Sequence, residues 1–157
     1  MKLVTTRIQL SSALPEARRA MVTLQSAIEK AAADAGLDQR LIELVKIRAS
    51  QLNGCAFCLD QHSRDARNLG ESQRRIVLLG AWRETDLYTE QERAALALTD
   101  AMTRLPQYQD VPDDVYEQAT SAFTQEQYAV VAWAATAINA WNRLGVTSRK
   151  PLPTEPA

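Results

Sequence analysis

Cysteine and histidine are scarce in this chain of 157 residues, which contains two cysteines and a single histidine. The cysteines, Cys55 and Cys58, are only three positions apart. Closing so small a loop would restrict the unfolded chain by only about 2 kcal/mol, against roughly 4.7 kcal/mol for a 100-residue loop. A disulfide framework that staples the fold is therefore excluded. The pair serves reactivity or metal binding, or it is incidental.

An excess of charge of one sign and long apolar runs are also lacking. The 18 basic and 19 acidic residues are interleaved and give a net charge of -1, so no basic stripe is available for nucleic acid or anionic lipid. No segment reaches the ~18 apolar residues of a membrane span, and residues 1–14 show no signal-peptide pattern. We expect a soluble cytoplasmic protein that binds neither nucleic acid nor membrane.

Strand patterns are absent as well, because no alternating run rich in Val, Ile and Thr occurs. Apolar residues recur instead at helical spacing, and capping residues, glycines and prolines divide the chain into about six to seven helices. The sequence predicts one all-α domain, a helical bundle over residues 1–149, with a Pro-rich, loosely held tail over 150–157. The expected helices are 12–35, capped by Ser11 or Ser12, then 38–53, 55–69, 72–82, 89–105, 113–123 and 124–144.

The last predicted helix, 124–144, is apolar on nearly every side. Gly145 is expected to end it as a C-cap. A helix of this kind is buried in the core or in a subunit interface. Between the two preceding helices, residues 106–112 form the longest expected loop, with a proline at each end.

Two charged residues on the helix 38–53 have different expected roles. Arg48 points near the centre of the apolar stripe, where an unpaired charge is costly, so we expect a carboxylate to pair with it for structural reasons. Glu43 lies in a narrow polar strip with Lys46 and Ser50. Helix geometry alone predicts that this strip faces solvent.

The chemistry of the chain concentrates in a C-x-x-C-x-x-x-H motif formed by Cys55, Cys58 and His62. Gly54 is expected to end the preceding helix, which places the motif on the first turns of the next one. At 100° per residue, Cys58 lies about 300° and His62 about 340° from Cys55, so the three side chains share one face. The helix dipole and His62 both stabilise a thiolate there.

Three interpretations of this motif remain open from the residues alone. A dithiol peroxidase or reductase needs a low-pKa attacking cysteine and a nearby resolving one, which the pair supplies. A metal-binding module would use Cys55, Cys58 and His62 with Glu43 as a fourth ligand, although structural zinc prefers four Cys or His ligands. In the third interpretation the motif simply lines the core, since Leu59 and other apolar residues share its face.

The motif and its surroundings resemble a known family. Glu43, eleven residues, and then the C-x-x-C-x-x-x-H motif, together with the segment 138–144 (Ile-Asn-Ala-Trp-Asn-Arg-Leu), are similar to the alkylhydroperoxidase AhpD-like branch of the carboxymuconolactone decarboxylase family. The resemblance covers roughly residues 15–146. The best-studied branch has a second histidine between the cysteines, where this chain has Phe57.

The resemblance implies an all-helical homo-oligomer, a trimer or a multiple of it, with thiol peroxidase activity and no cofactor or metal. In this activity Cys58 attacks a peroxide, Cys55 resolves it as a disulfide, and Glu43 and His62 relay protons. A dithiol or protein reductant is the implied partner. The spacing also favours Cys58, because His62 follows it by four residues, whereas the helix dipole favours Cys55.

Overall fold

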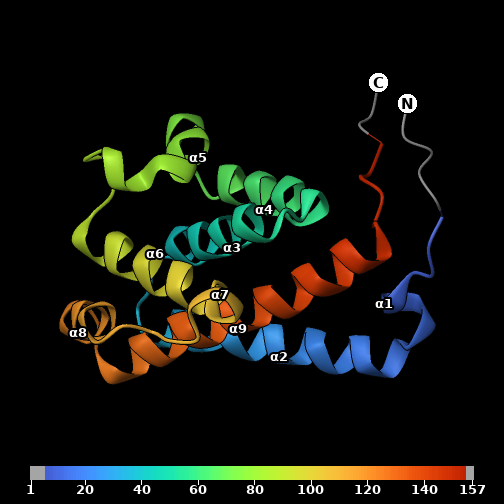
Figure 1. Ribbon diagram of the computed structural model, residues 1–157, viewed down its shortest axis with the longest axis horizontal. Coiled ribbons are helices and arrows are strands. Elements are labelled where there is room, and N and C mark those ends of the chain that lie inside the picture. The colour runs from blue at the N-terminus through green and yellow to red at the C-terminus, as the bar shows by residue number, and fades with distance from the viewer. Residues whose placement is uncertain (1–5, 155–157) are drawn as a thin grey trace.

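Helices form all the regular secondary structure of the described residues, 6–154, in the computed structural model (Figure 1). Within that range there is no strand, so the all-α prediction is confirmed. The elements are α1 (Leu10–Ala13), α2 (Pro15–Asp34), α3 (Gln39–Asn53), α4 (Ala56–Asn68), α5 (Gln73–Leu78), the 3₁₀-helix η1 (Leu79–Glu84), α6 (Glu90–Thr103), α7 (Leu105–Tyr108), α8 (Asp113–Ala122) and α9 (Gln125–Ser148).

The described residues contain more helices than predicted because the chain breaks at two prolines. The first expected helix divides at Leu14, since Pro15 opens α2 and its ring disfavours a helical conformation of the preceding residue. Ser11 and Ser12 lie inside α1 and do not cap α2, so the predicted cap was wrong. Pro106 sits in the first turn of α7, which occupies part of the expected loop.

α9 extends beyond its predicted end. Gly145 lies inside the helix, which continues to Ser148 and is terminated by Arg149 in the left-handed conformation. The prediction that Gly145 is the C-cap was therefore wrong. Its capping box, with Thr124 and Gln127 bonded reciprocally, begins the helix where the sequence predicted.

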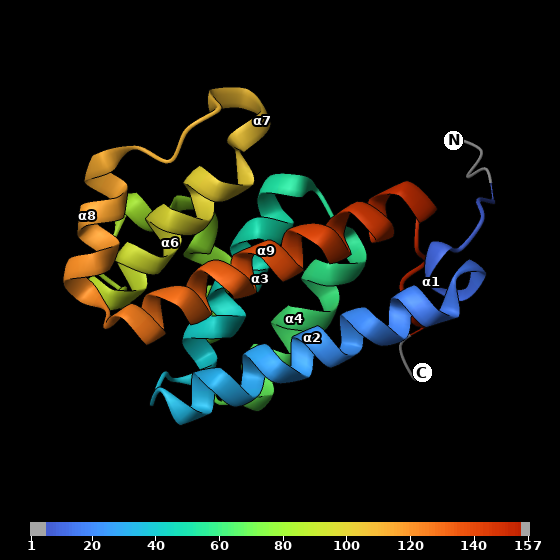
Figure 2. The same cartoon turned by 90° about the horizontal axis from the view of Figure 1, so that it is seen from below.

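α3 is the central element, and α4, α6 and α9 pack against it. α2 runs antiparallel to α9 and lies beside it: the two long helices are at the bottom of Figure 1, and in Figure 2, seen from below, α9 crosses the middle with α2 along the lower edge. Every residue of α3 from Leu41 to Ser50 is buried. The polar strip of α3 is enclosed for this reason, and the prediction that it faces solvent was wrong.

Burial of α9 is restricted to one side. Val131, Ala135 and Ile138 are in the core, whereas Trp133 is 54% exposed. The exposed aromatic ring leaves apolar surface on α9 that residues 6–154 do not cover. No helix within residues 6–154 is both long and apolar enough to cross a membrane.

Candidate active site

The two cysteines lie at the junction of α3 and α4. Gly54 ends α3 in the left-handed conformation (φ 67°), which lets the chain turn sharply, and Cys55 becomes the N-cap of α4. Cys58 lies in the first turn, and the two sulfurs form a disulfide across a Cα–Cα distance of 5.4 Å. Both residues are buried. The motif is therefore on the first turn of a helix, as the sequence predicted.

Gly145 of α9 packs directly on this disulfide. A Cβ atom at position 145 would lie 2.9 Å from Cys55 Sγ and 3.7 Å from Cys58 Sγ. The first distance is shorter than van der Waals contact allows, so only glycine fits without a shift of the sulfur or of α9. A glycine inside a regular helix can indicate a close approach of another group, but a glycine near a helix end is more often a C-cap, which is how we interpreted Gly145.

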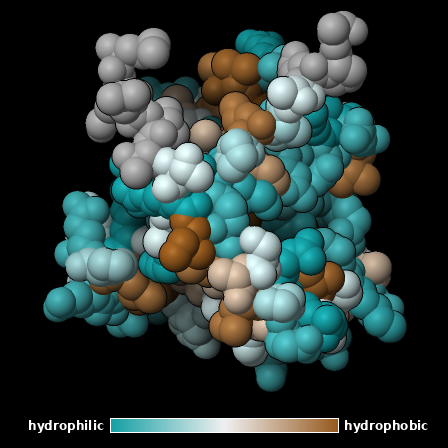
Figure 3. All heavy atoms as spheres, turned by 90° about the vertical axis from the view of Figure 1, so that its right-hand side faces the viewer, coloured by the Kyte–Doolittle hydropathy of each residue, from teal (hydrophilic) through white to brown (hydrophobic). Residues whose placement is uncertain are grey.

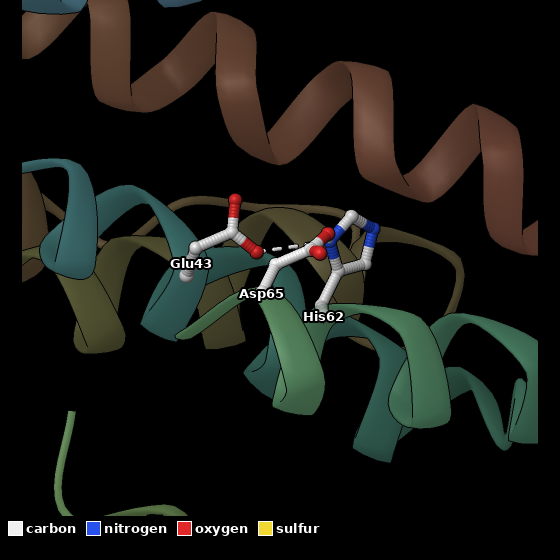
Figure 4. A group of neighbouring side chains, drawn as sticks. All are labelled: Glu43, His62 and Asp65. Atoms are coloured by element: carbon white, nitrogen blue, oxygen red, sulfur yellow. Dashed lines mark hydrogen bonds and ion pairs between the residues drawn. The ribbon is translucent and has the colours of Figure 1, made fainter. Parts of the chain in front are cut away.

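Glu43 and His62 form a buried hydrogen-bonded pair that links α3 to α4 (Figure 4). His62 Nδ1 lies 2.9 Å from Glu43 Oε2, and side-chain exposures are 14% and 9%. An ionised carboxylate only accepts hydrogen bonds, so Nδ1 carries the proton that is donated to Glu43. The Nε2 lone pair, on the side of the ring away from Glu43, remains available to accept a proton.

Lys46 supplies a positive charge to the same carboxylate. Its Nζ lies 2.8 Å from Glu43 Oε1 and 3.3 Å from Glu29 Oε1 of α2, and the Lys46 side chain is almost fully buried. Burial alone would raise the pKa of Glu43, but the hydrogen bond from His62 and the Lys46 ammonium outweigh it and hold that pKa below its ordinary value. Glu43 is therefore ionised at neutral pH, as the protonation assigned to His62 requires.

Asp65 adds a second carboxylate to this group (Figure 4). Its Oδ2 lies 3.8 Å from His62 Nδ1, and one oxygen or nitrogen from each of Glu43, His62 and Asp65 falls within 4.8 Å of the others. The metal-binding alternative considered from the sequence used both cysteines, which here are bonded to each other. The positive charge of Lys46 already compensates the negative charge of Glu43, and the Lys46 ammonium would repel a cation bound beside that carboxylate. These residues fit a proton relay better than a metal site.

The rest of the α3 polar strip binds α9 through side-chain amides. Asn142 is fully buried; its Nδ2 donates to Ser50 Oγ and its Oδ1 accepts from Asn53, both at 2.9 Å. Asn53 also donates to Asn139. These bonds fix the α9 turns that carry Gly145 against the motif. In the sequence, these hydrogen bonds were indicated only by the helical spacing of polar residues on α3, which we interpreted as a solvated face.

Arg48 has the structural role that the sequence predicted. Its guanidinium is buried and pairs with Asp100 of α6, with Nε 2.6 Å from Oδ1. Arg83 donates to the same carboxylate at 2.6 Å. Burial alone would raise the pKa of Asp100, but the two guanidinium groups hold it below its ordinary value. This network connects α3, α6 and η1 away from the cysteines.

A cavity of about 1460 Å³ opens between α2, α4 and the end of α9. Cys58, His62 and Glu43 line one end of it, while Cys55 lines a smaller hollow of about 380 Å³ nearby. Apolar walls come from α2, α4 and α9; they are Val22, Phe57, Leu69, Trp141 and Leu144. The two cysteines of the motif therefore adjoin two different hollows.

The first residues of the predicted tail belong to this site. Lys150 Nζ stacks 3.7 Å from the centre of the Phe57 ring, and both Lys150 and Pro151 line the cavity. Phe57, which stands where the best-studied branch has a histidine, therefore supports a cation. Residues 155–157 of the predicted tail lie outside the described residues.

The model of the carboxymuconolactone decarboxylase family matches residues 15–101, more than half of the chain. The uncharacterized protein YdfG of Bacillus subtilis is 38% identical over 140 residues, which are 89% of this chain and 92% of YdfG. The chain belongs to the carboxymuconolactone decarboxylase family.

Two solved structures share the fold. A protein of unknown function from Agrobacterium tumefaciens, for which a role as the antioxidant defence protein AhpD has been suggested, is 41% identical, with a TM-score of 0.87 over 96% of this chain and 100% of its own. The debrominase Bmp8 is 20% identical, with a TM-score of 0.78 over 91% of this chain and 74% of its own, and shows the fold alone. Within the family, this chain is AhpD-like.

Proposed function

We propose that this protein is a thiol-dependent peroxidase that reduces alkyl hydroperoxides with the Cys55–Cys58 pair. The observation that carries the proposal is the Cys55–Cys58 disulfide, whose Cys58 lines the large cavity and lies one helical turn from His62 of the buried Glu43–His62 pair. A second cysteine within disulfide reach is what a dithiol peroxidase needs to resolve its oxidised cysteine.

In the first step, His62 Nε2 takes the proton of the Cys58 thiol. The Cys58 thiolate then attacks the terminal peroxide oxygen, so that an S–O bond forms and the O–O bond breaks. The sulfur is oxidised to sulfenic acid, and the alkoxide leaves as the alcohol after His62 returns the proton. Glu43 holds the ring in the tautomer that this exchange requires and stabilises the imidazolium that forms.

In the second step, the Cys55 thiolate attacks the Cys58 sulfur and displaces hydroxide, which is released as water after protonation. The product is the disulfide seen in the structure. An external dithiol, either small or carried by a protein, then reduces the disulfide through a mixed disulfide and is itself oxidised. Its access to the sulfurs is through the two hollows that adjoin them.

Peroxide consumption tests this function. Reduced protein with dithiothreitol should consume tert-butyl hydroperoxide catalytically, and Cys58→Ser should reduce the rate to that of dithiothreitol alone. If the protein reduces a small aromatic disulfide rapidly but leaves the hydroperoxide untouched, it is a dithiol-disulfide oxidoreductase. That result would refute the peroxidase proposal.

We also propose that the protein forms a homo-oligomer, a trimer or a multiple of it. The half-exposed Trp133 and the apolar surface around it on α9 support this proposal. The assembly would cover that surface, while the cavity opens at the other end of α9.

A further inference from the structure

The charges that line the large cavity fall into two groups. Each acidic lining residue has a cationic or histidine partner: Glu29 and Glu43 contact Lys46, and Asp65 lies near His62. The second group is Arg7, Arg18 and Lys150, of which Arg7 and Lys150 also line the smaller hollow together with Cys55. Within residues 6–154, no carboxylate pairs with any of these three cations.

Contacts with the protein hold two of these cations in place. Arg7 donates one N–H to the carbonyl of Thr147 at 3.0 Å, which leaves its remaining donors free to bind a ligand. Lys150 is held over the ring of Phe57, the residue that directly precedes Cys58 in the sequence. Partial burial and the nearby Arg18 lower the pKa of Lys150, so these two cations lie close enough to affect each other.

Apolar side chains line the same cavity as these cations and Cys58. Val22, Phe57, Trp141 and Leu144 line the walls, and the volume of about 1460 Å³ is much greater than hydrogen peroxide needs. The end of the molecule that carries α1 and the last turns of α9 is mainly hydrophilic, with hydrophobic groups in small separate patches (Figure 3). The apolar walls of the cavity are therefore suited to a ligand that enters it, rather than to a broad protein surface.

We infer that the cavity binds amphiphilic anions, with the charged group at Arg7, Arg18 and Lys150 and the apolar chain along the walls. Resting on the proposed function, the preferred substrate is an alkyl hydroperoxide that carries a carboxylate or another anionic group. The cations without a carboxylate partner bind the head group, whereas the carboxylates that line the cavity are already compensated by Lys46 and His62.

The binding part of the test does not depend on turnover. Calorimetry should show that octanoate and octyl phosphate bind more tightly than octanol. Lys150→Glu should weaken octanoate binding about fivefold or more, because it replaces one attraction by a repulsion, and should leave octanol unchanged. Lys30→Glu is the matched control, since Lys30 is exposed on α2, pairs with Asp34 and does not line the cavity.

The turnover part compares linoleic acid hydroperoxide with its methyl ester, which differ in charge but hardly in size. Wild type should have the higher kcat/KM for the acid, and Lys150→Glu should remove that preference while Lys30→Glu retains it. Equal binding of octanoate and octanol, or equal turnover of acid and ester, would overturn the inference. If neither hydroperoxide is consumed while octanoate still binds through Lys150, the anion site stands and the peroxidase proposal fails.

Discussion

Because Gly145 packs on the disulfide, we expect Gly145→Ala to change the free energy of unfolding differently in the oxidised and reduced protein. Replacing a helical glycine by alanine normally stabilises a helix by about 1 kcal/mol. In Gly145→Ala, however, the new Cβ would lie 2.9 Å from Cys55 Sγ. Overpacking of this kind costs about 1–3 kcal/mol. The oxidised variant should therefore lose between about 0 and 2 kcal/mol of unfolding free energy.

The reduced variant should respond differently, because separate thiols can rotate away from the new methyl group. It should keep most of the gain of about 1 kcal/mol, so the two redox forms differ by about 1–3 kcal/mol in their response. At 30 mV per 1.4 kcal/mol, this difference raises the reduction potential of the disulfide by about 20–65 mV.

Urea unfolding of the oxidised and reduced forms measures the first quantity, and equilibration with dithiothreitol redox buffers measures the second. Gly80→Ala is the control, because a Cβ at position 80 would meet only the Gln51 side chain, at 4.0 Å. Its effect should be the same in both redox forms. If Gly145→Ala stabilised both forms equally, the packing of α9 on the sulfurs would not be as described.

The other predictions concern the buried charges and the assembly. Asp100→Asn leaves Arg48 buried with a neutral partner and should destabilise the protein by about 2–4 kcal/mol in urea unfolding. The pKa of Asp100 is lowered in the folded protein, so the ionised carboxylate contributes its full stabilisation above the unfolded pKa near 3.9, and this contribution is lost as pH falls through the folded pKa. The acid unfolding of Asp100→Asn should therefore be less steep than that of the wild type. An unchanged acid transition would contradict this prediction. Glu43→Gln should lower kcat/KM for peroxide about 10- to 100-fold, since His62 loses its charged partner; unchanged kinetics would exclude the relay. Light scattering should show a homo-oligomer at micromolar concentration, and a monomer would refute that proposal.

The local geometry of the motif was predictable from the sequence because it depends on neighbouring residues. Gly54 ends one helix as predicted, and the next helix carries Cys58 and His62 one turn apart, whereas Cys55 is its N-cap rather than a helical residue. The need of Arg48 for a carboxylate was predictable on energetic grounds. The identity of its partner, Asp100, was not, because that residue is 52 positions away.

Features that depend on packing between distant elements were misjudged or missed. The α3 strip that contains Glu43 has the composition of a solvated face, and only the packing of α2, α4 and α9 on α3 reverses that interpretation. The resemblance to AhpD-like proteins, rather than helix geometry, pointed Glu43 toward the motif. Gly145 and Lys150 joined the site for the same reason: the sequence showed a helix end and a tail, whereas the folded chain brings both to the sulfurs.

The identity of the attacking sulfur tests the proposed chemistry most directly. Reduced Cys55→Ser should be treated with one equivalent of tert-butyl hydroperoxide and dimedone, and the labelled site found by mass spectrometry. The account predicts a sulfenic acid on Cys58, trapped because its resolving partner is missing, and very slow labelling of Cys55 in Cys58→Ser. Labelling of Cys55 in Cys58→Ser as fast as the wild type consumes peroxide would contradict it and reverse the two roles.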